Sequence, residues 1–354
     1  MRRLISRRRL LGTAAAAGGA FGLEALAPAR AARQSWAARP PAGMERLSLP
    51  GKVVRVTGTG TLQPGGLWPT REAARALLER AMRELTGKSD LGEAFRLFVH
   101  PADRVAIKPN GIGGRRAQSM ASNKELVLEI VRGLLAAGVP AGSISVYEQY
   151  ESFLWGTRVV GAGRKLDPGF PAGVAAVVHG NRDAVMDSLA VGGVSTRFVR
   201  PLTEASAVIN VPLIKDHSNC GYTGALKNIT HGSIVNPEAF HAHRSSPQIA
   251  HLYAQDVVKS RVVLHLTDAF KVLYDGGPLD RRPECRVAHH SVYASTDPVA
   301  LDVVGWALCD ELRRANGLPA LAQSGREPTY IRVAGELGLG IFERARIGLR
   351  SVAA

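Results

Sequence analysis

The chain has 354 residues, 45% of them hydrophobic, and a formal net charge of +15 at pH 7. This length is enough to bury a full core as one large domain or as two lobes. Its three cysteines, Cys220, Cys285 and Cys309, include no CxxC pair, so they are too few and too scattered for a disulfide scaffold or a protein-held iron–sulfur cluster.

The N-terminal segment has the composition of an export signal. The first nine residues, MRRLISRRR, contain five arginines and no acid, and an Ala/Gly-rich apolar run follows from Leu10 to Leu26. Ala29-Arg30-Ala31 fits the small-x-small cleavage pattern of secretory signals. The segment SRRRLL (6–11) has the paired arginines of the twin-arginine (Tat) subtype.

We therefore expect residues 1–31 to be a Tat signal peptide cleaved near Ala31, with the Tat translocation machinery as a partner. The mature protein would then be periplasmic or otherwise extracytoplasmic. A short membrane anchor and a basic nucleic-acid-binding arm are the alternatives. A spanning helix needs about 20 strongly apolar residues, so we expect no stable membrane span after cleavage.

The chain keeps a positive net charge without residues 1–31. Removing six arginines and one glutamate from a chain of net +15 leaves about +10. This charge favours anionic ligands. The remaining arginines are scattered, often beside acidic residues, as in TREAARALLERAMRELTG, so we expect a solvated basic surface and no nucleic-acid partner.

Regular elements begin after a predicted flexible leader at 32–50. KVVRVTG, RVAIKPN (104–110) and SISVYE (143–148) are predicted strands because they are short and β-branched. Thr70 is predicted to cap a first helix, and a Ser122/Glu125 capping box a second. This β-α-β-α-β order is typical of a parallel sheet covered by helices.

The second half continues the alternation after a less regular segment, 151–200, which we interpret as an insertion or a small antiparallel piece. The predicted strands are 205–214, 261–269 and 291–296, and the predicted helices are 222–231, 247–259 and the one that Asp297-Pro298 opens. We expect an α/β fold with a mostly parallel or mixed sheet flanked by helices, a Rossmann-like layered architecture. This domain would cover 51–320, in one or two lobes, and a helical extension would follow at 321–354.

Polar residues follow three of the predicted strands, where open α/β sheets bind ligands. They are Lys108 and Asn110; Lys215, Asp216, His217, Asn219 and Cys220; and Asp268. The stretch from Gly111 to Gly114, with Arg115 behind it, could offer backbone N–H groups to an anion. It matches neither GxGxxG nor the P-loop, and a mobile glycine loop is the alternative.

The segment KDHSNCGYTGALKNITHG (215–232) is the most informative. A helix over 222–231 would place Thr223, Lys227 and His231 on one face, with Gly224 and Asn228 in the neighbouring row. Gly221 and Gly224 would permit close backbone approach to a ligand or another element. These side chains, with those of the preceding strand end, suit proton transfer or an anionic substrate. The alternative is a capped helix with a solvated lysine and a histidine at its C-terminus.

Histidines suggest a metal site as a further hypothesis, although no HExxH motif is present. His241-x-His243 would place two rings on one face of an extended segment. The hypothetical ligands are His217, Asp268, His241 and His243. The cofactor is otherwise unspecified.

The segment STDPVALD (295–302) contains two aspartates, one with an evident structural role and one whose partner is not evident from the sequence. Asp297 before Pro298 is an ideal helix N-cap. Asp302 lies inside an apolar helix, and we expect it to pair with Lys227 or Lys108.

Four of these segments, RVAIKPN, INVPLIKDHSNCGYTGALKNITHG, LTDAF and STDPVALD, occur in this order within residues 50–315. Together they resemble the family known as domain of unknown function 362. The resemblance implies these motif positions: Lys108, Pro109, Asn110, His217, Gly224, Lys227, Asn228, Asp268, Asp297 and Asp302. Several members resemble Tat-exported proteins, and some carry ferredoxin-type iron–sulfur domains, for which this sequence has no motif. The family implies no established reaction.

Our interpretation is an exported enzyme that acts on a small anionic substrate through Lys/His/Asp acid–base or metal-assisted chemistry. The predicted catalytic residues are His217, Lys227 and Asp268. The predicted anion-binding residues are Lys108, Asn110, Arg115, Gly224 and Asn228. The predicted supporting residues are His231, Asp297 and Asp302. The alternatives are a non-catalytic envelope protein that binds an anionic ligand or a metal, and a structural partner of another exported enzyme.

Overall fold

A computed structural model of the chain describes residues 36–114, 119–161 and 165–354. The predicted signal at 1–31 and Arg115 lie outside the described residues. Trp36–Ala354 form one compact unit. No helix within the described ranges combines the length and the apolar character needed to cross a bilayer.

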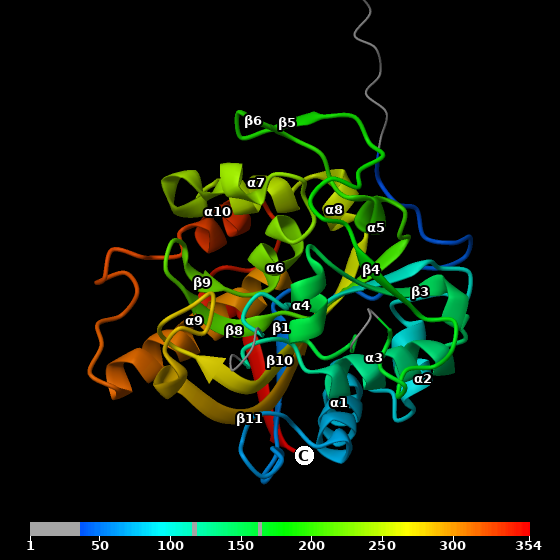
Figure 1. The fold of residues 1–354 in the computed structure, drawn as a ribbon, viewed down its shortest axis with the longest axis horizontal. Coiled ribbons are helices and arrows are strands. Elements are labelled where there is room, and N and C mark those ends of the chain that lie inside the picture. The colour runs from blue at the N-terminus through cyan, green and yellow to red at the C-terminus, as the bar shows by residue number, and fades with distance from the viewer. Residues whose placement is uncertain (1–35, 115–118, 162–164) are drawn as a thin grey trace, which may run out of the picture. The chain divides into compact units, whose positions relative to one another are not determined.

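A mixed sheet forms the centre of this unit and confirms the predicted α/β architecture (Figure 1). Its order is β12-β1-β11-β10-β7-β2-β3-β4, and β8 pairs with β10 and β9. Most pairs are parallel; β1–β11, β10–β11 and β8–β9 are antiparallel. The strands of this sheet are β1 (Lys52–Thr57), β2 (Val105–Lys108), β3 (Ile144–Glu148), β4 (Ala175–Val178), β7 (Ala207–Asn210), β8 (Leu213–His217), β9 (Gly221–Thr223), β10 (Val262–Leu273), β11 (Arg286–Ser295) and β12 (Gly348–Ala353).

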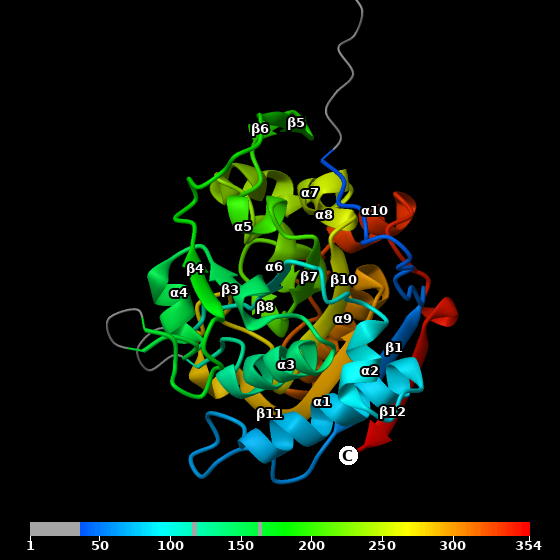
Figure 2. The same cartoon turned by 90° about the vertical axis from the view of Figure 1, so that its right-hand side faces the viewer.

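Helices cover the two faces of the sheet in separate groups, each with its own apolar core. One group holds α1 (Arg71–Thr86), α2 (Leu91–Arg96) and α3 (Lys124–Ala136), which Figure 2 shows side by side. The other holds α6 (Ala225–His231), α7 (Gln248–Tyr253), α9 (Pro298–Ala315) and α10 (Tyr330–Glu336). The short elements are α4 (Glu151–Gly156), α5 (Arg200–Thr203), α8 (Asp256–Lys259), the 3-10 turns η1 (Ala141–Ser143), η3 (Pro237–Ser245), η4 (Pro283–Cys285) and η5 (Arg344–Arg346), and the hairpin strands β5 (Leu189–Val191) and β6 (Val194–Thr196).

The local sequence explains the first α/β unit as predicted. Thr70 caps α1 by accepting a hydrogen bond from the Ala73 N–H, and Gly87 ends the helix in the left-handed region. Every residue of β2 and of β7 is buried. Strands that are buried along their whole length suit a parallel sheet that helices cover on both faces.

Several boundaries differ from the predictions. The single strand expected at 205–214 is two strands, β7 and β8, because Pro212 between them cannot donate to a ladder. The helix expected at 222–231 begins only at Ala225, after the short strand β9. The helix expected at 247–259 is divided into α7 and α8.

Both ends of the domain make more contacts with the rest of the fold than predicted. The helical extension expected at 321–354 contains α10 but finishes in β12, which pairs with β1 along its whole length. The leader expected at 32–50 is attached from Trp36 onward. Its Leu49 N–H donates to Thr296 Oγ1 (2.7 Å), and Arg46 forms an ion pair with Asp103 (2.9 Å). In the segment 151–200, β4 extends the main sheet while β5 and β6 form a separate hairpin.

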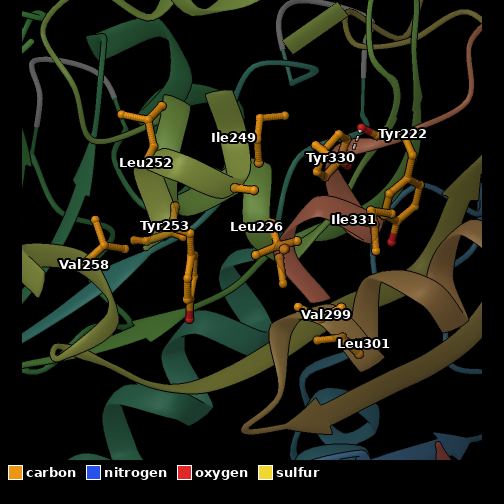
Figure 3. Packing of buried hydrophobic residues seen from close by; sticks show 14 of the residues in the cluster. Tyr222, Leu226, Ile249, Leu252, Tyr253, Val258, Val299, Leu301, Tyr330 and Ile331 are labelled. Carbon is orange, nitrogen blue, oxygen red and sulfur yellow. Dashed lines mark hydrogen bonds between the residues drawn. The ribbon is translucent and has the colours of Figure 1, made fainter. Parts of the chain in front are cut away.

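The core beneath α6 holds this short helix in place (Figure 3). Leu226 of α6 lies in one apolar cluster with Ile249 of α7 and Val299 of α9. The Tyr330 hydroxyl of α10 donates to the Tyr222 carbonyl of β9 (2.9 Å). The polar face of α6 therefore has a fixed position relative to the sheet.

Candidate functional site

A cavity of about 420 Å³ lies where several strands end. We call it the central cavity. Its lining includes Lys108, Glu148 and His217, the last residues of β2, β3 and β8. Ligands of α/β proteins bind at this edge of the sheet, and the volume suits a small molecule.

Strand β8 divides its side chains between two environments. Lys215 and His217 line the central cavity, as expected for residues two apart on a strand. Asp216 points elsewhere, where it accepts hydrogen bonds from Arg326 (2.7 Å) and the Gly277 N–H (3.0 Å). The Asp216 carboxylate is therefore paired away from the cavity.

Strand β9 and helix α6 supply a further part of the lining. Thr223, Lys227 and His231 all line the central cavity, which agrees with the predicted common face. Thr223 belongs to β9 and lies directly across from Lys215 in the antiparallel pair. Its buried Oγ1 has no hydrogen-bond partner among the described residues.

The N-terminus of α6 is held by Asp302 of α9. Its Oδ1 accepts from the Ala225 N–H (2.5 Å) and its Oδ2 from the Leu226 N–H (3.0 Å). These first-turn groups have no partner within the helix. The predicted ion pair of Asp302 with Lys227 or Lys108 is therefore wrong.

Gly224 makes this contact possible. A Cβ atom at this position would lie 2.1 Å from Asp302 Oδ1, so only glycine fits. Gly224 does not line the central cavity. The structure therefore does not place Gly224 where it could bind an anion in this cavity. The predicted close approach of its backbone to another element is confirmed, and that element is α9.

Asp297 behaves as predicted. Its Oδ1 accepts from the Val299 and Ala300 N–H groups at 3.0 and 2.9 Å, which caps α9. Its Oδ2 accepts from the Gly51 and Ile341 N–H groups. Asp297 therefore joins α9 to the two ends of the domain.

Asp268 lies outside the central cavity. Its Oδ2 accepts from the Asn123 N–H (2.6 Å), and the Asn123 side-chain amide donates to both oxygens. Asp268 thus holds the start of α3 from β10, and the predicted Ser122/Glu125 capping box is wrong. The structure does not join Asp268 with His217 and Lys227 as predicted.

Three buried lysines line the central cavity, and their partners differ. Lys108 Nζ forms an ion pair with Glu148 Oε1 (3.0 Å). Lys215 Nζ donates to Asn110 Oδ1 (2.7 Å). Lys227 Nζ lies 3.4 Å from His241 Nε2.

Positive charge is therefore in excess. Glu148 is the one buried carboxylate in the described lining, and Lys108 already neutralises it. Within the described part of the chain, neither Lys215 nor Lys227 has a carboxylate at ion-pair distance. Burial, reinforced by Lys227, lowers the pKa of Lys215 to about 7. Burial also lowers the pKa of Lys227.

Three histidines lie beside Lys227. The His241 ring stacks on that of His217 (centroids 5.8 Å apart) and meets that of His231 edge-on (4.8 Å). Burial and the neighbouring lysine lower the pKa of His241 to about 4, and the pKa values of the other two are also lowered. All three rings are therefore neutral near pH 7.

The protonation of two rings follows from their partners. His217 Nδ1 accepts from the Asn219 N–H (3.1 Å), so the hydrogen is on Nε2. His241 Nδ1 faces the Pro237 carbonyl (2.9 Å), which can only accept, so Nε2 carries the lone pair. That lone pair points to Lys227 Nζ.

The predicted metal set is not assembled. His243 is exposed with a φ of 48°, because η3 is a kinked 3-10 turn and not an extended segment. His243 and Asp268 both lie outside the central cavity. Within 36–114, 119–161 and 165–354, no group of three or more His, Cys, Asp or Glu side chains has the arrangement of a metal site.

The glycine stretch after Asn110 packs against protein. The Gly111 N–H donates to Glu148 Oε1 (2.8 Å), and a Cβ on Gly111 would lie 2.2 Å from the Phe153 carbonyl oxygen. This N–H is therefore not available to a ligand. Arg115, predicted to assist it, lies outside the described residues.

Asparagines connect the lysines to the core. Asn110 donates to Asn228 Oδ1 (2.9 Å), and Asn228 donates to Asn210 Oδ1 (2.7 Å). Asn228 also donates to the Lys108 carbonyl (3.1 Å), which fixes the orientation of its amide. The oxygen of Asn110 therefore remains turned toward Lys215.

Sequence reasoning missed Glu148 and the importance of Lys215 and Thr223. Glu148 ends a predicted strand, so the strand-end rule applied to Lys108 would have found it. Lys215 stands two residues before His217, and the period of a strand would have placed both on one side. The unpartnered state of the Thr223 hydroxyl has no sequence signal.

Residues 105–307 match the family model described as "Domain of unknown function (DUF362)". The match covers more than half of the chain. The chain belongs to the DUF362 family. The comparison with curated proteins gives no match. The three lysines, Glu148 and the three histidines of the central cavity all lie in the DUF362 region, while β1 and β12 lie outside it.

Proposed function

We propose that this DUF362 protein is an exported enzyme that binds a small anionic substrate in the central cavity and transfers a proton through Lys215. The observation that carries the proposal is the excess of buried cations there, three lysines against one buried carboxylate. A buried ammonium group without a counter-ion is costly, and an anionic ligand removes that cost.

The lysines differ in the roles that their surroundings favour. Lys227 lies next to neutral histidines and serves as the anchor for negative charge. Lys215, with a pKa of about 7, exchanges a proton at neutral pH and serves as the general base or acid. Lys108 is paired with Glu148 and supports the wall.

Acid–base chemistry fits this lining better than metal assistance. A cation on His241 Nε2 would meet the Lys227 ammonium group, which lies 3.4 Å from that nitrogen. Asp268, a predicted catalytic residue, accepts hydrogen bonds from Asn123 instead. The proposed proton-transfer set is therefore Lys215 with His217, which stand two residues apart on β8 and both line the cavity.

Calorimetric titration with oxalate and with inorganic phosphate tests the binding step. We expect Lys227→Met to weaken the binding of both by at least about tenfold, which corresponds to about 1.4 kcal/mol. Lys271→Met is the matched control, because Lys271 is also buried but donates to the Ser119 carbonyl outside the cavity. Equal affinity in the wild type and Lys227→Met would contradict the proposal. Binding without turnover of any tested substrate would favour the non-catalytic envelope protein.

Export by the Tat route remains part of the proposal and is supported by the arginine pair Arg7-Arg8. Replacement of both by lysine should retain the protein in the cytoplasm. Unchanged export of that double variant would contradict the Tat assignment.

A further inference from the structure

We propose that Lys215 forms an imine with the carbonyl group of a small oxo acid, so that the protein acts through a covalent lysine adduct. This inference rests on the proposed function, because it takes the central cavity as an anion site. It adds the class of substrate, a carbonyl compound with a carboxylate, and the atom that attacks it.

The first support is the contrast between two buried lysines of the same cavity. Lys108 is 2% exposed, and although burial lowers its pKa, Glu148 at 3.0 Å stabilises its charged form. Lys215 is 0% exposed, and among the residues that the structure describes its Nζ donates to neutral acceptors only, Asn110 Oδ1 (2.7 Å) and the Pro278 carbonyl (3.3 Å). An amine becomes a nucleophile when it is desolvated and lies near another cation. Lys215 meets both conditions, since Lys227 lines the same cavity.

The second support is the unpartnered hydroxyl of Thr223. This residue is 4% exposed, lines the cavity, and lies directly across from Lys215 in the β8–β9 pair. Side chains at directly opposite positions of an antiparallel pair lie close together on one face. Buried hydroxyl groups nearly always have a hydrogen-bond partner, so this one points to a ligand atom. We infer that the oxygen of a carbonyl group at Lys215 Nζ accepts a hydrogen bond from the Thr223 hydroxyl.

The third support is Lys227, which stands four residues after Thr223 and lines the same cavity. A carboxylate held by Lys227 places the remainder of the substrate toward Thr223 and Lys215. A single small molecule with a carbonyl and a carboxylate can therefore engage all three side chains. The pKa of Lys215, about 7, leaves a large neutral fraction at neutral pH.

The chemical step balances without an oxidant or a reductant. The lone pair of neutral Lys215 Nζ forms a bond to the carbonyl carbon while the C=O π electrons move to the oxygen, and one nitrogen proton passes to that oxygen to give a carbinolamine. The hydroxyl group then takes a second proton and leaves as water while the nitrogen lone pair forms the C=N bond. The remaining nitrogen proton is released in place of the one taken up, so amine and carbonyl become imine and water. Thr223 donates a hydrogen bond to the oxygen, while Asn110 Oδ1 accepts from the nitrogen before attack.

Reductive trapping tests the inference on the purified full chain. The protein is incubated with glyoxylate, pyruvate or 2-oxoglutarate and then with sodium borohydride, and adducts are located by mass spectrometry. We expect one adduct, on Lys215, with at least one of these probes. Lys215→Arg, which lacks a primary amine, should give none, Thr223→Val should slow its formation about tenfold, and the control Lys271→Met should keep it.

The outcomes separate this inference from the proposed function. No adduct in the wild type, or an adduct retained in Lys215→Arg, overturns the imine. An unchanged rate in Thr223→Val overturns the role of its hydroxyl. Oxalate has no ketone or aldehyde group, so oxalate binding without any adduct leaves the anion site standing while the imine fails. If the wild type neither binds oxalate nor forms an adduct, both the proposed anion site and the imine are rejected.

Discussion

Lys215 and Thr223 face each other across the antiparallel pair of β8 and β9, and both line the central cavity. One contributes a buried amine without a carboxylate partner, and the other a buried hydroxyl without any partner among the described residues. Each costs stability in an empty cavity, so their pairing indicates that the fold is adapted to a ligand.

The first prediction concerns the pH dependence of stability. The pKa of Lys215 is about 7 in the folded protein, while an unfolded lysine has a pKa of about 10.4. Between these values the unfolded chain binds the additional proton, so the free energy of unfolding rises with pH from about 7 to about 10. Below pH 7 Lys215 is protonated in both the folded and the unfolded protein, so the full cost of burying its charge lowers the free energy of unfolding.

Urea unfolding at pH 6.5, 8 and 9.5 checks this prediction. The wild type should gain stability relative to Lys215→Met as pH rises, because the variant lacks the titrating group. Parallel pH profiles of the two proteins would show that the Lys215 pKa is not lowered.

The second prediction concerns the contact between Asp302 and α6. Asn at position 302 can accept only one of the two N–H bonds and turns an NH₂ group toward the other donor. We expect Asp302→Asn to lower the free energy of unfolding by about 1–3 kcal/mol, the cost of an unsatisfied buried group. Asp187→Asn is the control, since Asp187 is exposed. Equal stability of the two variants in urea unfolding would refute the role of Asp302.

The third prediction concerns Gly224. Gly224→Ala should destabilise the protein by about 1–3 kcal/mol, a typical cost of overpacking, because its Cβ would lie 2.1 Å from Asp302 Oδ1. Gly142→Ala is a matched control, since a Cβ there meets nothing within 4 Å. Thermal unfolding of both variants checks the difference, and a Gly224→Ala protein as stable as its control would be inconsistent with the packing described.

The fourth prediction concerns the coupling of two lysines. Lys227 lowers the pKa of Lys215, so Lys227→Met should raise it. The rate of acetylation of Lys215 by acetic anhydride, followed by mass spectrometry across pH, should therefore reach its midpoint at higher pH in this variant. An unchanged midpoint would mean that the two ammonium groups do not interact.

The fold and the place of the site could be predicted because both follow from local patterns. The caps at Thr70 and Asp297, the buried strands, and the polar residues at strand ends need only a few neighbouring residues. The prediction that Thr223 and Lys227 lie on one side is also confirmed, because both line the cavity. It holds even though Thr223 belongs to a strand and not to the helix.

The roles of Asp302 and Asp268 could not be predicted in the same way. Asp302 caps a helix 77 residues earlier in the chain, and Asp268 one 145 residues earlier. A carboxylate that satisfies backbone N–H groups so far along the chain has the same sequence surroundings as one that awaits a substrate. Only the packing of α9 on α6, and of β10 beside α3, separates these roles.

The most direct test of the central claim is proton uptake when an anion binds. At pH 8 most Lys215 is neutral, and a bound anion favours the charged form, so oxalate binding should draw a proton from the buffer. Calorimetric titration in two buffers of different ionisation enthalpy measures this uptake. The account predicts a substantial fraction of one proton in the wild type and close to none in Lys215→Met, and binding without any proton uptake in the wild type would contradict it.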